Sequence, residues 1–233
     1  MNEPSASSTG SKVRSAAAVM VQPTDAGLPV RAEYWDTACR SLSRRDPVMR
    51  RIIRAHPGIA LRRRGEPFMT LARAVVGQQI SVKAADSVWS KVVIAAPDIT
   101  PSQVLAAGRD RLLLCGLSGR KAEYILDLAD RFNTGAILPD GWSAMDDEAV
   151  IKDLVQLRGI GRWTAEMFLI FNLLRPDVLP LDDLGLQKAM RANYFRRAPT
   201  MKAMTALAEN WRPWRSAATW YLWRSLEPVP VEY

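Results

Sequence analysis

Apolar residues recur along most of the chain at the three- and four-residue spacing of amphipathic helices. No segment alternates apolar and polar residues convincingly enough for a strand, and we find no internal repeat. From Ala32 onward, proline and glycine divide the pattern into short helices. Asp46-Pro47 and Thr100-Pro101 have the form of an N-cap followed by a first-turn proline, and Pro213 marks the opening of the last helix. The pattern predicts an all-α protein.

Two helical stripes meet at a pair of glycines, Gly159 and Gly161. The first stripe ends with Leu154 and Val155, and the second begins at Trp163. A tight hairpin is predicted, in which both glycines adopt backbone angles closed to other residues and let a ligand approach the main chain. The second helix would then point its free N–H groups and positive dipole end at an anion. An ordinary helix C-cap followed by a new helix explains the same pattern.

A pair of carboxylates, Asp182 and Asp183, follows about one helix later in the run Leu179-Pro180-Leu181-Asp182-Asp183. Another helical stripe begins directly after them, and aspartate at such a position often caps the helix. Neighbours in sequence do not share a helix face. We therefore assign the cap to Asp182, which leaves Asp183 to point into a cleft.

The charge balance favours a polyanionic partner. The chain has 233 residues, with 32 Lys and Arg against 24 Asp and Glu, and its isoelectric point is about 9.9. The glycine run lacks the third glycine of a dinucleotide fingerprint and the Gly-Lys-Ser/Thr ending of a phosphate loop, which argues against a mononucleotide cofactor. No apolar run approaches the roughly 20 residues that cross a bilayer.

Cysteine and histidine are scarce. Cys39 and Cys115 are the two cysteines, and they make no disulfide framework, which suggests a reducing compartment. Two cysteines are too few for a four-cysteine iron–sulfur cluster. His56 is the single histidine, so a zinc site is not expected.

Taken together, these motifs resemble the helix-hairpin-helix DNA glycosylases with a Gly/Pro-rich loop and a catalytic aspartate, in their 3-methyladenine (alkylbase) branch. The resemblance covers roughly residues 35–226. Its matching segments are residues 157–165 for the hairpin, residues 179–183 for the loop and carboxylate, residues 67–85 with Val76-Gly77-Gln78-Gln79-Ile80-Ser81 for an upstream helix pair, Leu117-Ser118-Gly119-Arg120-Lys121-Ala122, and Trp211-Arg212-Pro213-Trp214-Arg215-Ser216.

The resemblance implies two helical domains with the active-site cleft between them. We expect a flexible leader over residues 1–30 and a discontinuous first domain built from residues 31–66 and 185–233. The second domain would span residues 67–184 and contain the helix-hairpin-helix at residues 151–175 together with the catalytic loop.

The resemblance also assigns chemistry. Asp183 is the expected catalytic carboxylate, acting on the N-glycosidic bond of a damaged base. Members that also cut the DNA backbone place a lysine just after the hairpin, where it forms a Schiff base. Trp163 stands at that position here, which indicates a monofunctional glycosylase. Trp163 and Trp223 are the expected walls of the base pocket, although core packing is the commoner role of a tryptophan at helical spacing such as Trp163.

The upstream loop is where the family inserts a side chain into the gap left by the extruded nucleotide. Gln79 stands where the alkylbase branch presents a leucine wedge. Loop solvation, with Ser81 capping the next helix, is the alternative for this segment. Lys83 and Arg73 could touch phosphates. The expected DNA-binding residues are Gln78, Gln79, Ser81, Lys83, Gly159, Ile160, Gly161 and Thr164.

No cofactor is required by this assignment, but the family hairpin often holds a monovalent cation, here through the main chain of Val155, Leu157 and Ile160. The expected partner is double-stranded DNA containing damaged bases, bound by a monomer. A bacterial protein would act in the cytoplasm at the nucleoid, and a eukaryotic one in the nucleus. Two alternatives stay open: a non-catalytic helix-hairpin-helix DNA-binding module, and a bifunctional glycosylase and lyase for oxidised bases. The sequence does not rank 3-methyladenine against 7-methylguanine, hypoxanthine or ethenoadenine.

Overall fold

The computed structural model describes residues 30–63 and 65–226, and over these ranges the chain is helical. Within them, β pairing is limited to one isolated bridge between Arg31 and Arg62. The prediction of an all-α protein is therefore confirmed. Apart from Val30, the predicted leader over residues 1–30 lies outside the described residues.

The helices follow one another with short connections. Their bounds are α1 Trp35–Arg45, α2 Pro47–Ala55, α3 Pro67–Gly77, α4 Val82–Ala95, α5 Pro101–Leu114, α6 Gly119–Asn133, the 3-10 helix η1 Pro139–Ala144, α7 Asp147–Leu154, α8 Arg162–Phe171, α9 Leu184–Tyr194, α10 Met201–Glu209 and α11 Arg215–Leu226.

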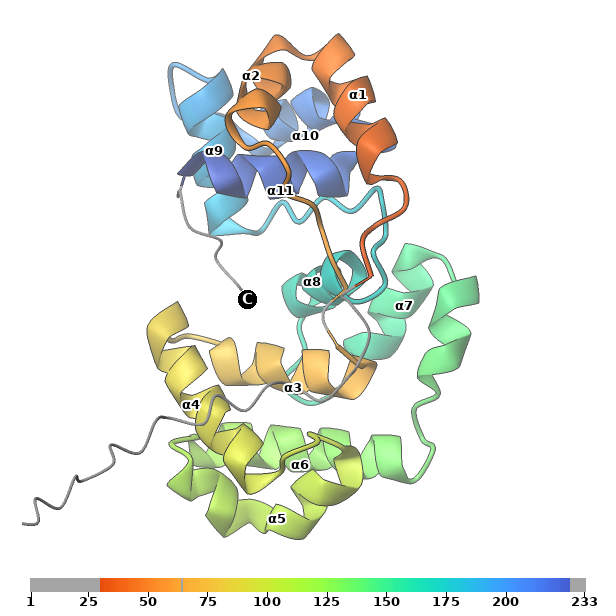
Figure 1. Ribbon diagram of the computed structural model, residues 1–233, viewed down its shortest axis with the longest axis vertical. Coiled ribbons are helices and arrows are strands. Elements are labelled where there is room, and N and C mark those ends of the chain that lie inside the picture. Colours follow the sequence, from red (N-terminus) through yellow and green to blue (C-terminus); the bar gives the residue numbers. More distant parts are fainter. Residues whose placement is uncertain (1–29, 64, 227–233) are drawn as a thin grey trace, which may run out of the picture.

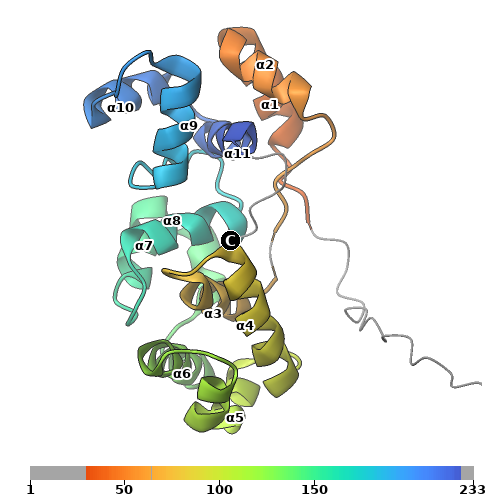
Figure 2. The same cartoon turned by 90° about the vertical axis from the view of Figure 1, so that its left-hand side faces the viewer.

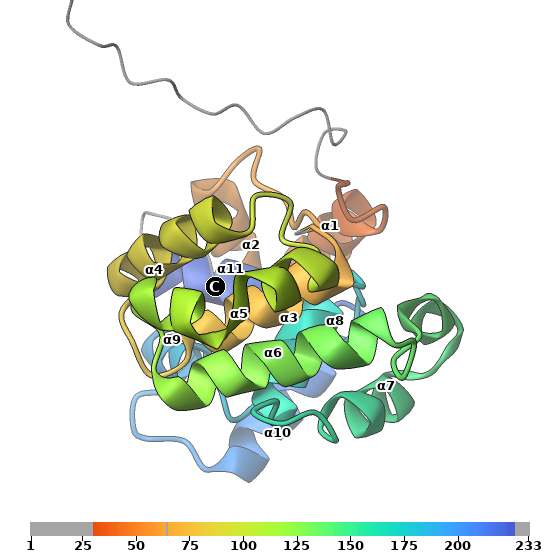
Figure 3. The same ribbon diagram turned by 90° about the horizontal axis from the view of Figure 1, so that it is seen from below.

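The helices form two groups stacked along the long axis of the molecule (Figure 1, Figure 2). One group contains α1 and α2 from the start of the described chain and α9 to α11 from its end; the other contains α3 to α8. The helix pairs with the most extensive contacts lie within one group or the other, such as α1 with α2 and α5 with α6. In the second group, α5 and α6 lie below α3 in Figure 1 and therefore in front of it in Figure 3, which views the molecule from below. The boundaries at residues 66 and 184 themselves stay a prediction.

Each group has a helix that is buried on nearly every side. Residues 164–171 of α8 and residues 216–224 of α11 are all buried. A helix enclosed in this way is held by neighbours in every direction rather than along one stripe. The catalytic loop predicted from the sequence connects α8 to α9, which packs on α11, so it lies between these two well-supported elements.

Local start signals account for several helix boundaries. Asp46 caps α2 by accepting hydrogen bonds from the N–H groups of Val48 and Met49, and Thr100 caps α5. Both predicted cap and proline pairs are therefore confirmed. The prediction for Pro213 is wrong by two residues, since α11 begins at Arg215. Pro213 lies instead in the preceding turn, which the N–H of Trp214 closes onto the carbonyl of Trp211 at 2.7 Å.

Asp46 also connects distant parts of the first group. Its Oδ2 accepts a hydrogen bond from the Tyr194 hydroxyl at 2.8 Å and another from the Trp211 indole at 3.0 Å. The carboxylate is buried, and its partners come from α9 and from the turn before α11. One side chain therefore joins α2 to two segments almost 150 residues or more away in sequence.

We expect Asp46→Ala to lower the free energy of unfolding by about 3 kcal/mol, because it removes a helix cap and leaves two buried donors without an acceptor. Chemical denaturation followed by circular dichroism measures this change. Asp36→Ala is the matched control, since Asp36 forms an exposed ion pair with Arg31 that contributes little. Equal stabilities for the two variants would show that Asp46 does not hold the group together.

Candidate active site

Asp183 is buried at the start of α9, with both carboxylate oxygens engaged. Its Oδ1 accepts hydrogen bonds from the N–H of Leu186 at 2.6 Å and from the indole of Trp223 at 2.8 Å. Its Oδ2 accepts a hydrogen bond from the indole of Trp163 at 3.0 Å. The structure therefore brings together the predicted carboxylate and both predicted pocket tryptophans, from α8, α9 and α11.

The division of roles predicted for the two aspartates is wrong. Asp183 itself is the N-cap of α9, whereas Asp182 is exposed. The reason is the turn before the helix, in which the N–H of Asp183 donates to the carbonyl of Pro180 at 3.0 Å and makes Leu184 the first helical residue. A carboxylate has two oxygens, so capping the helix with one does not prevent the other from facing a site.

The loop that carries Asp183 is tied to the start of α11. The Ser216 hydroxyl donates to the carbonyl of Arg175 at 2.6 Å and accepts from the N–H of Val178 at 3.0 Å. Asp177 pairs with Arg215 at 2.7 Å. These contacts join residues about 40 positions apart, and no local pattern predicts them beyond the family motif around Ser216.

A small pocket of about 60 Å³ lies between α3 and α8, and Trp163 connects it to this carboxylate. Trp163 is half-buried and has two functions, since it lines the pocket and donates to Asp183. The described lining consists of Thr70, Leu71, Arg73, Ala74, Gly77, Trp163, Thr164, Met167, Phe168 and Phe171. Thr164 is buried in this lining, so its side chain faces the pocket region rather than the outer surface.

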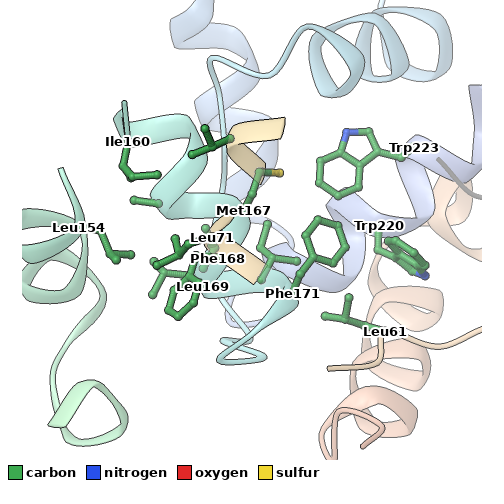
Figure 4. Close-up of a cluster of buried hydrophobic side chains, with 14 of the residues drawn as sticks. Leu61, Leu71, Leu154, Ile160, Met167, Phe168, Leu169, Phe171, Trp220 and Trp223 are labelled. Carbon is green, nitrogen blue, oxygen red and sulfur yellow. The ribbon is translucent and has the colours of Figure 1, made fainter. Parts of the chain in front are cut away.

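Aromatic rings connect the pocket to α11. Phe171 lines the pocket and stacks on Trp223, with ring centroids 5.9 Å apart and planes at 17°. Trp220 packs edge-on against Phe171, and Figure 4 shows Phe171 between Met167 and the two tryptophans. Trp223 therefore contributes to the site through Asp183 and Phe171, and it is not itself among the described lining residues.

Gly185 allows the close approach of Asp183 and Trp223, and sequence reasoning missed it. A Cβ at this position would lie 3.1 Å from Oδ1 of Asp183 and 3.3 Å from the Trp223 ring. Both contacts are tighter than ordinary packing. A glycine two residues after a candidate carboxylate is the signal that could have indicated this crowding.

The hairpin glycines have different functions. Gly159 has a φ of +84°, and a Cβ there would collide with the ring of Tyr124, so both the backbone conformation and the space require glycine. Gly161 has a φ of −94°, and a Cβ there would meet nothing within 4 Å. The prediction that both glycines need special backbone angles is wrong for Gly161, because the chain is already extended as it enters α8.

The hairpin exposes main chain at Gly161. Gly161 is exposed, while the side chain of Ile160 is buried in the core, as Figure 4 shows. Any contact of Ile160 with a ligand would therefore use its backbone. The first N–H groups of α8 follow directly, and such groups have no partner within the helix itself.

The loop between α3 and α4 lies against this hairpin. The Gln78 side chain donates to the carbonyl of Gly159 at 2.8 Å. Gln79 is exposed and has a φ of +59°, which is uncommon for a residue with a side chain. Ser81 caps α4 through the N–H of Ala84, so the capping alternative holds for this residue. Lys83 is exposed on the first turn of α4.

Residues 72–213 match the model of a family described as HhH-GPD superfamily base excision DNA repair protein. The chain belongs to the HhH-GPD superfamily. A DNA-3-methyladenine glycosylase 1 of Schizosaccharomyces pombe is 34% identical over 69% of this chain and 72% of its own length. A putative DNA-3-methyladenine glycosylase, YfjP, of Bacillus subtilis is 40% identical over 47% of this chain and 39% of its own length.

Among solved structures, the S. pombe 3-methyladenine DNA glycosylase Mag1 in complex with abasic DNA superposes with a TM-score of 0.72 at 30% identity. The match covers 84% of this chain and 99% of Mag1. The resemblance and the two-domain helical fold expected from it are therefore confirmed. None of the helices in residues 30–63 and 65–226 is long and apolar enough to cross a membrane.

One further acidic side chain of this HhH-GPD protein is buried close to the loop that carries Asp182 and Asp183. Glu166 on α8 accepts a hydrogen bond from Arg162 at 3.2 Å, and Arg162 also pairs with Glu148 on α7. Burial raises the pKa of Glu166 to about 7, and the charge of Asp182 adds to this effect while Arg162 opposes it. Arg162 lowers the pKa of the more exposed Glu148.

We expect Gly159→Ala to destabilise the protein by roughly 3 kcal/mol, since it adds strain at positive φ to a clash with a packed ring. Gly161→Ala should change stability by less than about 0.5 kcal/mol, as is usual for a surface substitution without strain. Thermal or chemical denaturation of the two variants measures the difference. Similar losses for both would contradict the division of functions within the hairpin.

The contribution of Glu166 to stability should fall as pH rises from about 4.5 to about 7, because folded Glu166 holds its proton over a range in which the unfolded chain has lost it. Glu166→Gln should remove this contribution and raise the free energy of unfolding at pH 8 by roughly 2 kcal/mol. Denaturation curves across this range test it. Glu148→Gln is the control and should not stabilise the protein at pH 8; a stabilisation equal to that of Glu166→Gln would exclude burial as the cause.

Proposed function

We propose that this HhH-GPD protein is a monofunctional DNA glycosylase. It flips alkylated purines, 3-methyladenine and related bases, out of duplex DNA and hydrolyses their N-glycosidic bond, which initiates base excision repair. The observation that supports this function most directly is the buried Asp183 carboxylate, oriented by two tryptophan N–H groups beside an aromatic pocket.

The geometry suits electrostatic stabilisation of the deoxyribose as the base departs. Positive charge builds on the deoxyribose as the bond breaks, and a fixed carboxylate in a water-poor site stabilises it without having to reorient. Trp163, Trp223 and the Leu186 N–H set the orientation of Asp183 before substrate binds. A cationic base leaves readily, so a second carboxyl group to protonate it is not needed, in contrast to most sugar hydrolases.

The pocket lining suits a flat cationic base. Trp163 and Phe171 line the pocket from α8, and the small residues Ala74 and Gly77 line it from α3. An electron-rich ring attracts a cation by about 0.5 to 2 kcal/mol, which discriminates an alkylated purine from its normal counterpart. The rank order among 3-methyladenine, 7-methylguanine, hypoxanthine and ethenoadenine does not follow from these contacts.

Hydrolysis by water fits the site better than backbone cleavage by a lysine. A lyase needs an amine near the sugar carbon, and Trp163 occupies the position after the hairpin and donates its indole N–H to Asp183. The described residues that line the pocket include Arg73 but no lysine. The product is then an abasic site in an uncut strand.

Duplex DNA would be held by two loops. The open main chain at Gly161 and the first turn of α8 receive a phosphate, aided by the positive net charge. Gln79 enters the gap left by the extruded nucleotide, and Lys83 contacts a neighbouring phosphate. We propose that the protein acts as a monomer, in the cytoplasm at the nucleoid of a bacterium or in the nucleus of a eukaryote.

A monovalent cation at the hairpin is part of the same proposal. The carbonyls of Val155, Leu157 and Ile160 belong to one turn of chain. The Leu157 carbonyl accepts the N–H of Ile160 at 3.0 Å and keeps a second lone pair for an ion. These oxygens suit a hard cation, which would add positive charge where the phosphate binds.

Asp183→Asn should lower the rate of base release from DNA containing 3-methyladenine by roughly 100- to 1,000-fold, because the amide carries no charge and turns a donor towards Trp163. DNA binding should stay close to the wild-type level, since asparagine is also a good helix cap. Base release is measured by chromatography under single-turnover conditions, and binding by fluorescence anisotropy.

Asp182→Asn is the matched control, because it removes an exposed carboxylate one residue away and should leave base release unchanged. Release at the wild-type rate by Asp183→Asn would exclude the catalytic carboxylate. Absence of release by the wild-type protein, with binding retained, would favour a non-catalytic DNA-binding module. Trapping of a covalent adduct with borohydride would favour a bifunctional lyase.

A further inference from the structure

Helix α6 contacts both loops that the proposed function assigns to DNA, namely the α3–α4 loop and the hairpin. The ammonium group of Lys121 on its first turn donates to the carbonyl of Val76 at 2.8 Å and to the carbonyl of Gln78 at 2.6 Å. Burial lowers the pKa of Lys121 below its ordinary value. Both acceptors belong to the C-terminal end of α3, where helical carbonyls lack partners and the dipole favours a cation.

Tyr124 stands three residues after Lys121, on the same face of α6. Its ring packs against Gly159 so closely that no side chain fits there. The Gln78 side chain then closes the arrangement by donating to the Gly159 carbonyl at 2.8 Å. The α3–α4 loop, the hairpin and α6 therefore form a closed triangle of contacts.

The bond from Lys121 to the Gln78 carbonyl has a particular consequence. That carbonyl belongs to the peptide unit joining Gln78 to Gln79, so fixing its direction also restricts the φ angle of Gln79. Gln79 has a φ of +59°, a conformation that costs a residue with a side chain about 1 kcal/mol or more. A strained residue persists only where its surroundings hold it in place.

We propose that Lys121 is a positioning residue for nucleotide extrusion. It holds the peptide unit before Gln79 in the orientation that presents the Gln79 side chain to the duplex, at a fixed distance from the hairpin that grips the strand. The inference rests on the proposed function, but it concerns the extrusion step and not the chemistry at Asp183.

The direction of the Lys121 N–H donors distinguishes a positioning residue from a residue that contacts phosphate. Two of the three N–H donors of Lys121 point inward to main-chain carbonyls. Removing a lysine that contacts phosphate reduces the salt dependence of DNA binding by about one unit of slope. Removing a positioning lysine should leave that slope unchanged.

The test uses Lys121→Met, which keeps the length of the side chain and removes its donors, and Lys121→Arg, which keeps the charge and the donors. Lys202→Met on α10 is the control for loss of one exposed positive charge. Extrusion is followed by the fluorescence of 2-aminopurine placed beside an abasic-site analogue in duplex DNA, which requires no catalysis. Affinity at several salt concentrations and single-turnover release of 3-methyladenine complete the comparison.

We expect Lys121→Met to show a fluorescence rise and a release rate about 10-fold below wild type, because a small displacement of a positioned group has a large kinetic effect. Its affinity should stay within about 3-fold of wild type, with an unchanged salt slope. Lys121→Arg should recover most of the rise, and Lys202→Met should match wild type. If Lys121→Met fails to fold, Lys121→Gln is measured in the same way with the same expectation.

A fluorescence rise equal to wild type in Lys121→Met, or in Lys121→Gln where that variant replaces it, would overturn the inference. A reduced salt slope would also overturn it, since it would make Lys121 a phosphate ligand. The proposed function fails separately: a wild-type protein that unstacks 2-aminopurine but releases no alkylated base keeps the positioning function of Lys121 and loses the glycosylase assignment.

Discussion

The arrangement of the site depends on one carboxylate that accepts hydrogen bonds from three helices. Asp183 caps α9, receives the indole of Trp163 from α8 and receives the indole of Trp223 from α11. Since α8 and α11 are the buried helices of the two groups, their separation is fixed at this point. The hydrogen bonds that orient Asp183 therefore come from both groups and not from either alone.

The same bonding pattern occurs where no reaction is expected. Asp46 also caps a helix with Oδ1 and accepts an indole N–H and a hydroxyl with Oδ2, yet it lies within the core of the first group. An aspartate that caps a helix and also accepts two side-chain hydrogen bonds therefore occurs twice among the described residues, and in Asp46 it serves stability alone. Asp183 differs in its neighbour, because Trp163 lines a pocket on one side and binds the carboxylate on the other.

Sequence reasoning recovered what local pattern and motif encode. Helical periodicity gave the all-α class, and the glycine pair and the motif around Asp183 gave the hairpin and the carboxylate. The cap was assigned to the wrong aspartate because the first residue of α9 depends on the turn before it. The helical pattern does not show that turn. The contacts of Gly185 and Lys121 were missed because their partners lie up to 45 residues away and depend on the tertiary fold.

The hairpin illustrates how rigidity and access are assigned to separate residues. Gly159 faces inward, where Tyr124 fills the space that a side chain would take, so this residue fixes the turn against α6. Gly161 faces outward with nothing near it, so this residue leaves the main chain open. A glycine with both functions would leave the turn either unsupported or blocked. The spacing of one apolar residue between them also lets Ile160 anchor the hairpin in the core, so that the exposed main chain is held still where a phosphate would bind.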